Sequence, residues 1–203
     1  MSRNNHRGLF LRKSLKLNLF VLLSIGLVAC SSSTAKTAPS LIATSESGII
    51  TFEDPLLEEM IRETIGQPEG GITLERAKLV KRLDLHDDLQ AFLSQDSLIE
   101  KIQGLEAFTN LESLDLSSHA ITDISPLQGL KKLTSLSLAG NPIEDISPLE
   151  ELTNLKALTL SGSKAQNYSV LSKLVTLQVL TLDNSTISDL GPLTGLTNLR
   201  ILK

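Results

Sequence analysis

The sequence predicts an α/β fold, a right-handed solenoid of short repeats with a helical cap at its N-terminal end. Two observations predict it. Leucines recur at intervals of 22 residues, at Leu111, Leu133, Leu155, Leu177 and Leu199. Aromatic residues make up only 3% of the 203 residues, which favours many similar leucine layers over one core built around large rings. A repeat this short cannot bury its own apolar side, so neighbouring repeats must stack.

Residues 1–29 are expected to be a lipoprotein signal peptide. Five basic residues and no acidic residue precede the apolar run LNLFVLLSIGLVA at 17–29, which is short for a membrane span and suits a signal peptide. The run ends in LVAC, which resembles the bacterial lipobox, where the Cys thiol receives a diacylglyceryl group and becomes the new N-terminus. The resemblance implies a lipid on Cys30, the only cysteine, and location at the extracytoplasmic face of a bacterial cell membrane. The alternative is a small buried thiol at the end of a membrane helix.

Residues 30–48 are expected to be a flexible tether and residues 49–79 an N-terminal cap. The tether is rich in Ser, Thr and Ala and lacks apolar periodicity. In the cap, Asp54 is placed to be the N-cap of an amphipathic helix that Gly66 ends. The apolar residues on one face of this helix are Leu57, Met60, Ile61 and Ile65. One short helix cannot form a domain alone, so we expect it to cover the apolar end of the repeats.

Residues 80–203 hold one divergent repeat with an insertion, four full repeats and one that breaks off. Each repeat contains L-x-x-L-x-L, as in LESLDL from residue 111 and LTSLSL from residue 133. The alternation predicts a short strand with one buried face, and the strands should stack into a parallel concave sheet. A fixed period of this length is typical of a leucine-rich-repeat solenoid.

The full pattern L-x-x-L-x-x-L-x-L-x-x-N-x-I-x-D-I-x-P-L resembles the 22-residue repeat of bacterial internalin-type leucine-rich-repeat proteins. Residues 133–154, LTSLSLAGNPIEDISPLEELTN, match it at almost every position. The cap helix and the GGITLERAKL segment after it are also similar to the cap of such proteins. The resemblance covers about residues 49–203 and implies a concave sheet, with 3-10 helices and loops on the convex side.

The chain departs from this pattern in three places. The Asn position, which in the family bonds backbone groups of adjacent turns, reads His119, Asn141, Ser163 and Ser185. In the third full repeat Asn167, Tyr168 and Val170 replace Asp, Ile and Pro, so we expect a less regular turn there. The first repeat carries an insertion, in which Leu89, Phe92 and Leu93 after Asp88 suggest a short helical bulge.

The recurring stretch ITDISPL at 121–127 is interpreted as the convex corner of each coil. It returns as IEDISPL at 143–149 and, loosened, as ISDLGPL at 187–193. The Pro fixes the backbone at the start of a turn and the carboxylate is placed to cap it. The carboxylates expected to form this structural ladder are Asp123, Asp145 and Asp189.

Composition and motifs exclude several functions. Without the five basic residues of the signal peptide the chain has 14 basic and 23 acidic residues, which argues against a nucleic-acid partner. No phosphate loop, G-x-S-x-G or H-E-x-x-H motif is present, and SGSK at 161–164 fits S-x-x-K only formally. We therefore expect no enzyme and no cofactor. Asp84, His86 and Asp115 could gather with Asp87 and Asp88, but the spacing is not that of a calcium loop, and a solvated acidic patch is favoured over a metal site.

The concave face of the sheet is the candidate binding surface, because the third, fifth and seventh positions of L-x-x-L-x-L-x point away from the leucines. The expected binding residues are Arg82, Asp84, His86, Ser113, Asp115, Ser117, Ser135, Ser137, Thr159, Ser161, Thr181 and Asp183. The resemblance implies a non-catalytic interaction module for an extracellular protein or glycan. Two alternatives stay open. The sheet could be solvated and have no partner, or the repeats could be the targeting arm of a longer surface enzyme or wall-attached protein that is truncated at Lys203.

Overall fold

A computed structural model describes residues 48–86 and 98–203. The signal peptide, Cys30, almost all of the tether and the helical bulge expected around Phe92 lie outside these residues. Within them, no helix has both the length and the apolar character needed to cross a membrane.

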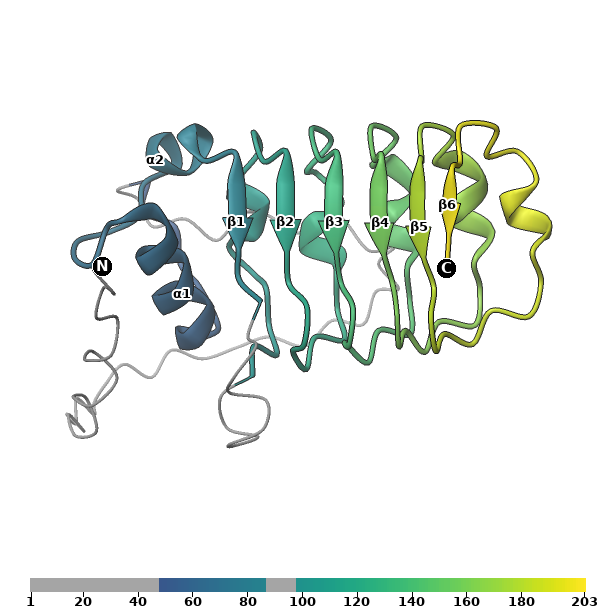
Figure 1. Cartoon of the computed structure of the whole chain (residues 1–203). Helices are drawn as coiled ribbons and strands as arrows, with labels where there is room; N and C mark the ends of the chain where they lie inside the picture. Colours follow the sequence, from purple (N-terminus) through teal and green to yellow (C-terminus); the bar gives the residue numbers. More distant parts are fainter. Residues whose placement is uncertain (1–47, 87–97) are drawn as a thin grey trace, which may run out of the picture. The chain divides into compact units, whose positions relative to one another are not determined.

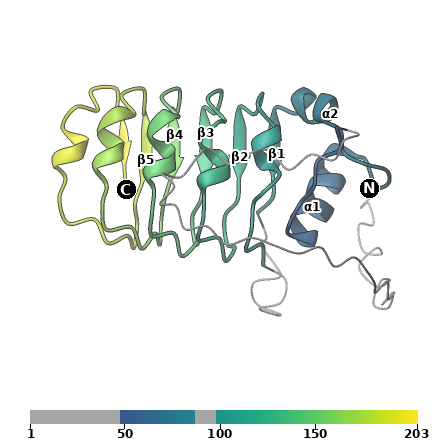
Figure 2. The same cartoon turned by 180° about the vertical axis from the view of Figure 1, so that it is seen from behind.

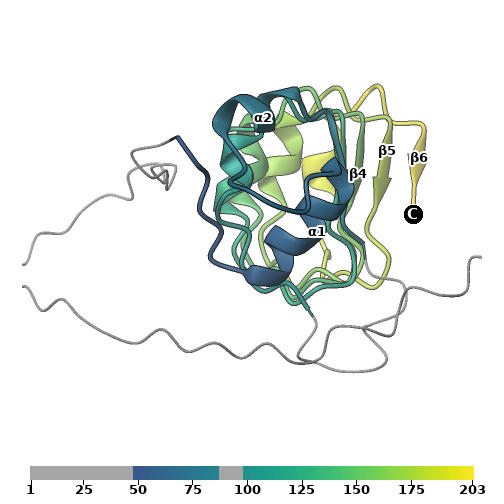
Figure 3. The same cartoon turned by 90° about the vertical axis from the view of Figure 1, so that its left-hand side faces the viewer.

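The N-terminal cap consists of two helices, α1 (Pro55–Ile65) and α2 (Leu74–Leu79). Helix α1 begins and ends as the sequence predicts: the Asp54 carboxylate accepts from the backbone N–H of Leu56 at 2.9 Å, and Gly66 ends the helix in the left-handed conformation at φ 67°. Leu57 and Ile61 are fully buried. Figure 3 shows α1 and α2 at one end of the stack of strands, where they cover it.

The repeats form one parallel sheet of six short strands in the order β1-β2-β3-β4-β5-β6 (Figure 1). The strands are β1 (Arg82–Asp84), β2 (Ser113–Asp115), β3 (Ser135–Ser137), β4 (Ala157–Thr159), β5 (Val179–Thr181) and β6 (Ile201–Leu202). Their central leucines pair in register across the whole sheet, from Leu83 to Leu202. The predicted solenoid is therefore confirmed.

The side opposite the strands is built from short 3-10 helices, as predicted (Figure 2). They are η2 (Leu105–Ala107), η3 (Ser125–Leu127), η4 (Ser147–Glu151), η5 (Ser169–Lys173) and η6 (Gly191–Leu193). Between the strands and these helices lies one continuous core of leucine and isoleucine, with the leucines of the 22-residue column almost all fully buried.

Side-chain oxygens close the turns before the 3-10 helices. Asp123, Asp145 and Asp189 each accept from the backbone N–H two residues ahead at 2.8 Å. The expectation of a less regular third turn is wrong: the amide oxygen of Asn167 accepts the same hydrogen bond at 2.9 Å, and Tyr168 has the backbone conformation of its counterpart Ile146. An amide oxygen accepts this bond as well as a carboxylate does.

At three of the four Asn positions, His119, Asn141 and Ser163, the side chain is buried and bonds backbone groups of neighbouring coils. Asn141 accepts from the N–H of Ile121 at 3.1 Å and donates to the carbonyl of Leu116 at 2.8 Å. Ser163 donates to the carbonyl of Ile143 and accepts from the N–H of Ala165. These bonds join successive coils inside the core, where an unpaired backbone group would be costly.

Candidate functional site

The candidate site is the outward face of the parallel sheet, called the sheet face below. The alternation around the buried leucines places three rows of side chains on it. The first row is Arg82, Ser113, Ser135, Ala157, Val179 and Ile201, and the second is Asp84, Asp115, Ser137, Thr159, Thr181 and Lys203. The third row follows the strand ends and contains His86, Ser117, Ala139, Ser161 and Asp183.

All twelve predicted binding residues occur in these three rows. The first two rows are paired in register by the strands. The third row stays in step because Ser118, Gly140 and Gly162 each donate a backbone hydrogen bond at 2.8 Å to the next coil. Every side chain in the rows is exposed or half-exposed. The residues predicted from the sequence therefore lie next to one another on one continuous surface.

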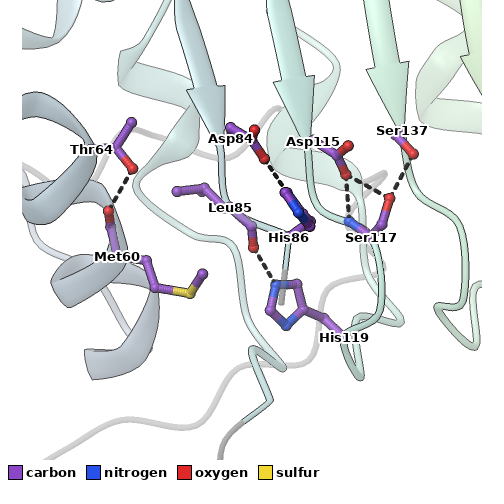
Figure 4. Close-up of polar contacts among 9 residues, drawn as sticks. All are labelled: Met60, Thr64, Asp84, Leu85, His86, Asp115, Ser117, His119 and Ser137. Atoms are coloured by element: carbon purple, nitrogen blue, oxygen red, sulfur yellow. Dashed lines mark hydrogen bonds and ion pairs between the residues drawn. The ribbon is translucent and has the colours of Figure 1, made fainter. Parts of the chain in front are cut away.

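The β1–β2 end of the sheet face is acidic. Asp84 and Asp115 lie directly opposite each other in the parallel register. Asp84 contacts the Nδ1 atom of His86 (Figure 4). The side chain of Asp84 is 68% exposed and that of His86 is 39% exposed. The predicted acidic cluster thus assembles in part, while Asp87 and Asp88 lie outside the described residues.

Asp115 is held in place by a chain of hydrogen bonds that runs along the sheet face. Its Oδ1 atom accepts from the backbone N–H of Ser117 at 2.9 Å and from the Ser117 hydroxyl at 2.5 Å. The Ser117 hydroxyl in turn lies 2.6 Å from the hydroxyl of Ser137 on the next coil (Figure 4). Because the bonds cross from one coil to the next, they depend on the strand register. They orient the carboxylate before any partner arrives.

The same end brings three metal-ligating groups together. One ligand atom each from Asp84, His86 and Asp115 lies within 4.8 Å of the other two. The Oδ1 atom of Asp115 is already engaged by Ser117, and Nδ1 of His86 by Asp84. Exposed carboxylates commonly gather without a cation, so we assign no metal to this cluster.

The sheet face changes character along the solenoid. Its middle carries hydroxyl groups, and in the first row the side chains turn apolar from Ala157 through Val179 to Ile201. Ile201 is 46% exposed. The three rows contain no Phe, Tyr or Trp. A partner would therefore meet an acidic end, a hydroxyl-rich centre and, at the β5–β6 end, an apolar first row flanked by Asp183 and Lys203.

A ladder of asparagines, separate from the carboxylate ladder at the turns, lies at the start of the strands. It was not predicted from the sequence. Asn110, Asn154 and Asn198 each donate a side-chain hydrogen bond to a backbone carbonyl of the preceding coil, at 2.7, 2.8 and 2.9 Å. The signal was present, because T-N-L recurs every 44 residues before the strand. This ladder ties together the edge of the sheet from which the sheet face projects.

The family model for leucine-rich repeats (2 copies) matches residues 131–173. The chain folds as a leucine-rich-repeat solenoid. The matched residues include strands β3 and β4, the centre of the sheet face. No curated protein sequence matches this leucine-rich-repeat chain.

Two solved structures of internalins from Listeria monocytogenes are similar to this leucine-rich-repeat protein. The internalin InlF gives a TM-score of 0.61 at 32% sequence identity, over 74% of this chain and 49% of InlF. The internalin InlC2 gives a TM-score of 0.55 at 28% identity, over 75% of this chain and 74% of InlC2. The chain thus spans about half the length of InlF. The likeness agrees with the resemblance noted in the cap and the repeats.

Proposed function

We propose that this chain is a non-catalytic interaction module that binds an extracellular protein or glycan through the sheet face. The observation that carries the proposal is the sheet face itself, three in-register rows of exposed and half-exposed side chains. Leucine-rich-repeat and other solenoids use such extended surfaces for binding. The 3-10 helices lie on the opposite side and the cap lies at the β1 end, so no described element covers this face (Figures 1 and 2).

The hydrogen-bond chain from Asp115 through Ser117 to Ser137 supports the proposal. Side chains that are already fixed lose less conformational entropy when a partner binds, and this raises affinity. These three side chains extend from the acidic β1–β2 end to β3, toward the hydroxyl groups of β4 and β5. A partner would therefore meet polar groups that need little rearrangement.

In this proposal a lipid on Cys30 holds the module at the extracytoplasmic face of a bacterial membrane. The basic and apolar segments that precede Cys30, and the LVAC sequence that ends in it, support this anchoring. Two acyl chains provide stable attachment, whereas a single chain binds only marginally. The Ser- and Thr-rich tether would then present the repeats away from the lipid surface.

A second function uses the same face in a different setting. The repeats would be the targeting arm of a longer surface enzyme or wall-attached protein. The comparison with InlF supports this second function, because InlF is longer and this chain spans only 49% of it. Both functions require a competent sheet face, so one binding experiment tests the part they share.

The test compares three forms of the full-length chain on arrays of defined extracellular proteins and glycans. The sheet-face variant carries Asp115→Lys, Ser137→Arg and Thr159→Arg. The control variant carries Glu144→Lys, Gln128→Arg and Ser188→Arg, which make the same charge changes outside the sheet face. We expect the wild type and the control to bind the same array members, and the sheet-face variant to lose them. Equal binding by all three forms would refute the proposal.

A further inference from the structure

We infer that the partner contributes an extended polypeptide segment that runs across the strands, with a Lys or Arg side chain at the β1–β2 end and an aliphatic side chain at the β5–β6 end. The inference rests on the proposed function, because it names the kind of partner that the sheet face accepts. It follows from the distribution of charge and apolar surface along the face.

The acidic end supplies the first half of the argument. Asp84 and Asp115 are directly opposed, and like charges at opposed positions of neighbouring strands repel. Within residues 48–86 and 98–203, neither carboxylate forms an ion pair with a Lys or Arg. A cationic side chain from a partner would relieve this repulsion. The electrostatics at this end therefore favour a basic partner group.

Arg82 lies on the same face and does not neutralise the two carboxylates. No ion pair joins it to Asp84 or Asp115. Its charge acts on Glu112 at the strand-start edge: the pKa of Glu112 is lowered first by its hydrogen bond to Lys81, then by the charge of Lys81, and to a smaller extent by Arg82.

The two carboxylates have acceptor atoms available for a guanidinium or ammonium group. Both bonds to Ser117 use the Oδ1 atom of Asp115, and its Oδ2 atom has no hydrogen-bond partner in the part of the chain that the structure describes. Asp84 projects into solvent with 68% of its side chain exposed. Charge-assisted hydrogen bonds to such carboxylates are among the stronger polar contacts in proteins.

The apolar first row at the β5–β6 end supplies the second half of the argument and favours a polypeptide over a glycan. The first row turns apolar at Ala157, Val179 and Ile201, all of them half-exposed or exposed. A glycan would place hydroxyl groups against this apolar strip, and burying polar groups without partners is unfavourable. An aliphatic side chain of a polypeptide would bury it with a gain in free energy.

The strand spacing predicts how far apart the two anchors are in the partner. Neighbouring strands are about 4.8 Å apart, so the distance from β2 to β5 or β6 is about 14 to 19 Å. An extended chain advances about 3.3 Å per residue. The basic and aliphatic residues of the partner should therefore be about four to six positions apart.

The experiment is a selection from a random dodecapeptide library displayed on phage, with the full-length chain as bait. Enriched sequences are synthesised with a fluorescent label, and their Kd is measured by fluorescence anisotropy. The test variant is Asp84→Asn with Asp115→Asn, which keeps the side-chain shape. The matched control is Asp123→Asn with Asp145→Asn, where an amide closes the turn as Asn167 already does. A Ser137→Arg variant reports whether a peptide occupies the sheet face at all.

We expect the enriched peptides to carry Lys or Arg about four to six positions from an aliphatic residue. The test variant should raise their Kd about tenfold, the control should leave it unchanged, and Ser137→Arg should abolish binding. Two results would overturn the inference and leave the proposed function standing. In the first, the peptides that Ser137→Arg blocks lack a basic residue. In the second, they bind the test variant as tightly as the wild type. If no peptide is enriched, the inference fails and the proposed function stands, because a face that binds a glycan would enrich no peptide. If Ser137→Arg blocks none of the enriched peptides, both fail.

Discussion

At the scale of single residues, His119 shows how one side chain can replace another of different shape inside a repeat. It stands where Asn141 stands one coil later, and it is 3% exposed. Its Nδ1 atom accepts from the N–H of Ile99 at 3.3 Å, and its Nε2 atom lies 2.7 Å from the carbonyl of Leu85. One neutral tautomer satisfies both contacts, with the proton on Nε2. The imidazole thus accepts and donates as the amide of Asn141 does.

Two substitutions of His119 should have opposite effects on stability. His119→Asn restores the residue type of the repeat pattern and should leave the free energy of unfolding nearly unchanged. His119→Leu fills similar space but leaves the N–H of Ile99 and the carbonyl of Leu85 unpaired, at a cost of about 2–4 kcal/mol. Urea denaturation followed by circular dichroism measures both. Equal stability of the Leu variant and the wild type would contradict the assigned role.

Two buried hydroxyl groups mark the limit of prediction at this scale. The oxygens of Tyr168 and Ser185 are buried without a hydrogen-bond partner among the described residues. The sequence identified both positions as departures from the repeat pattern. Whether a replacement side chain finds partners depends on distances of a few tenths of an ångström inside the core, and periodicity carries no such information.

At the scale of elements, the cap and the repeats are joined through one carboxylate. The Oδ1 atom of Asp54 caps helix α1, while its Oδ2 atom accepts from the backbone N–H of Glu100 at 2.9 Å and of Lys101 at 3.4 Å. Lys101 also forms an ion pair with Glu53 at 3.0 Å. The residue predicted as an N-cap therefore also fixes the chain at the start of the second coil, some 46 residues later.

Substitutions at Asp54 should separate the two roles. Asp54→Ser keeps an oxygen for the helix cap but loses the bonds to Glu100 and Lys101, which should cost about 1–3 kcal/mol. Asp54→Ala loses both roles and should cost about 1 kcal/mol more than the Ser variant. Denaturation gives the free energies, and amide hydrogen exchange at Glu100 and Lys101 should accelerate in both variants. If Ser matches the wild type in both measurements, Asp54 is a helix cap and no more.

The elements themselves were largely predictable, and the reason is physical. The period of two in L-x-x-L-x-L fixes which strand residues are buried, and the 22-residue period fixes which residues of successive strands lie side by side. Together these placed all twelve expected residues on one face. The hydrogen bond between Ser117 and Ser137 could not be predicted in the same way, because it depends on rotamers as well as on register. The Asn110 ladder was missed although its T-N-L signal is visible.

At the scale of the whole molecule, the proposal joins a binding face to a membrane anchor at Cys30. Cys30→Ala should leave the precursor unprocessed or release the protein into the medium, because no thiol remains for the lipid. Phase partitioning in detergent and the mass of the mature chain measure this. Cys30→Ser serves as a second variant that tests the thiol with little change in size. Unchanged detergent partitioning of both variants would refute the lipid anchor.

The proposed function requires the partner to contact the sheet face. Site-specific photo-crosslinking in intact cells can establish this, with a benzophenone amino acid placed at Ser137 on the sheet face or at Gln128 after η3 on the opposite side. We expect a partner adduct from position 137 and none from position 128. Adducts from position 128 alone, or from neither position, would contradict it.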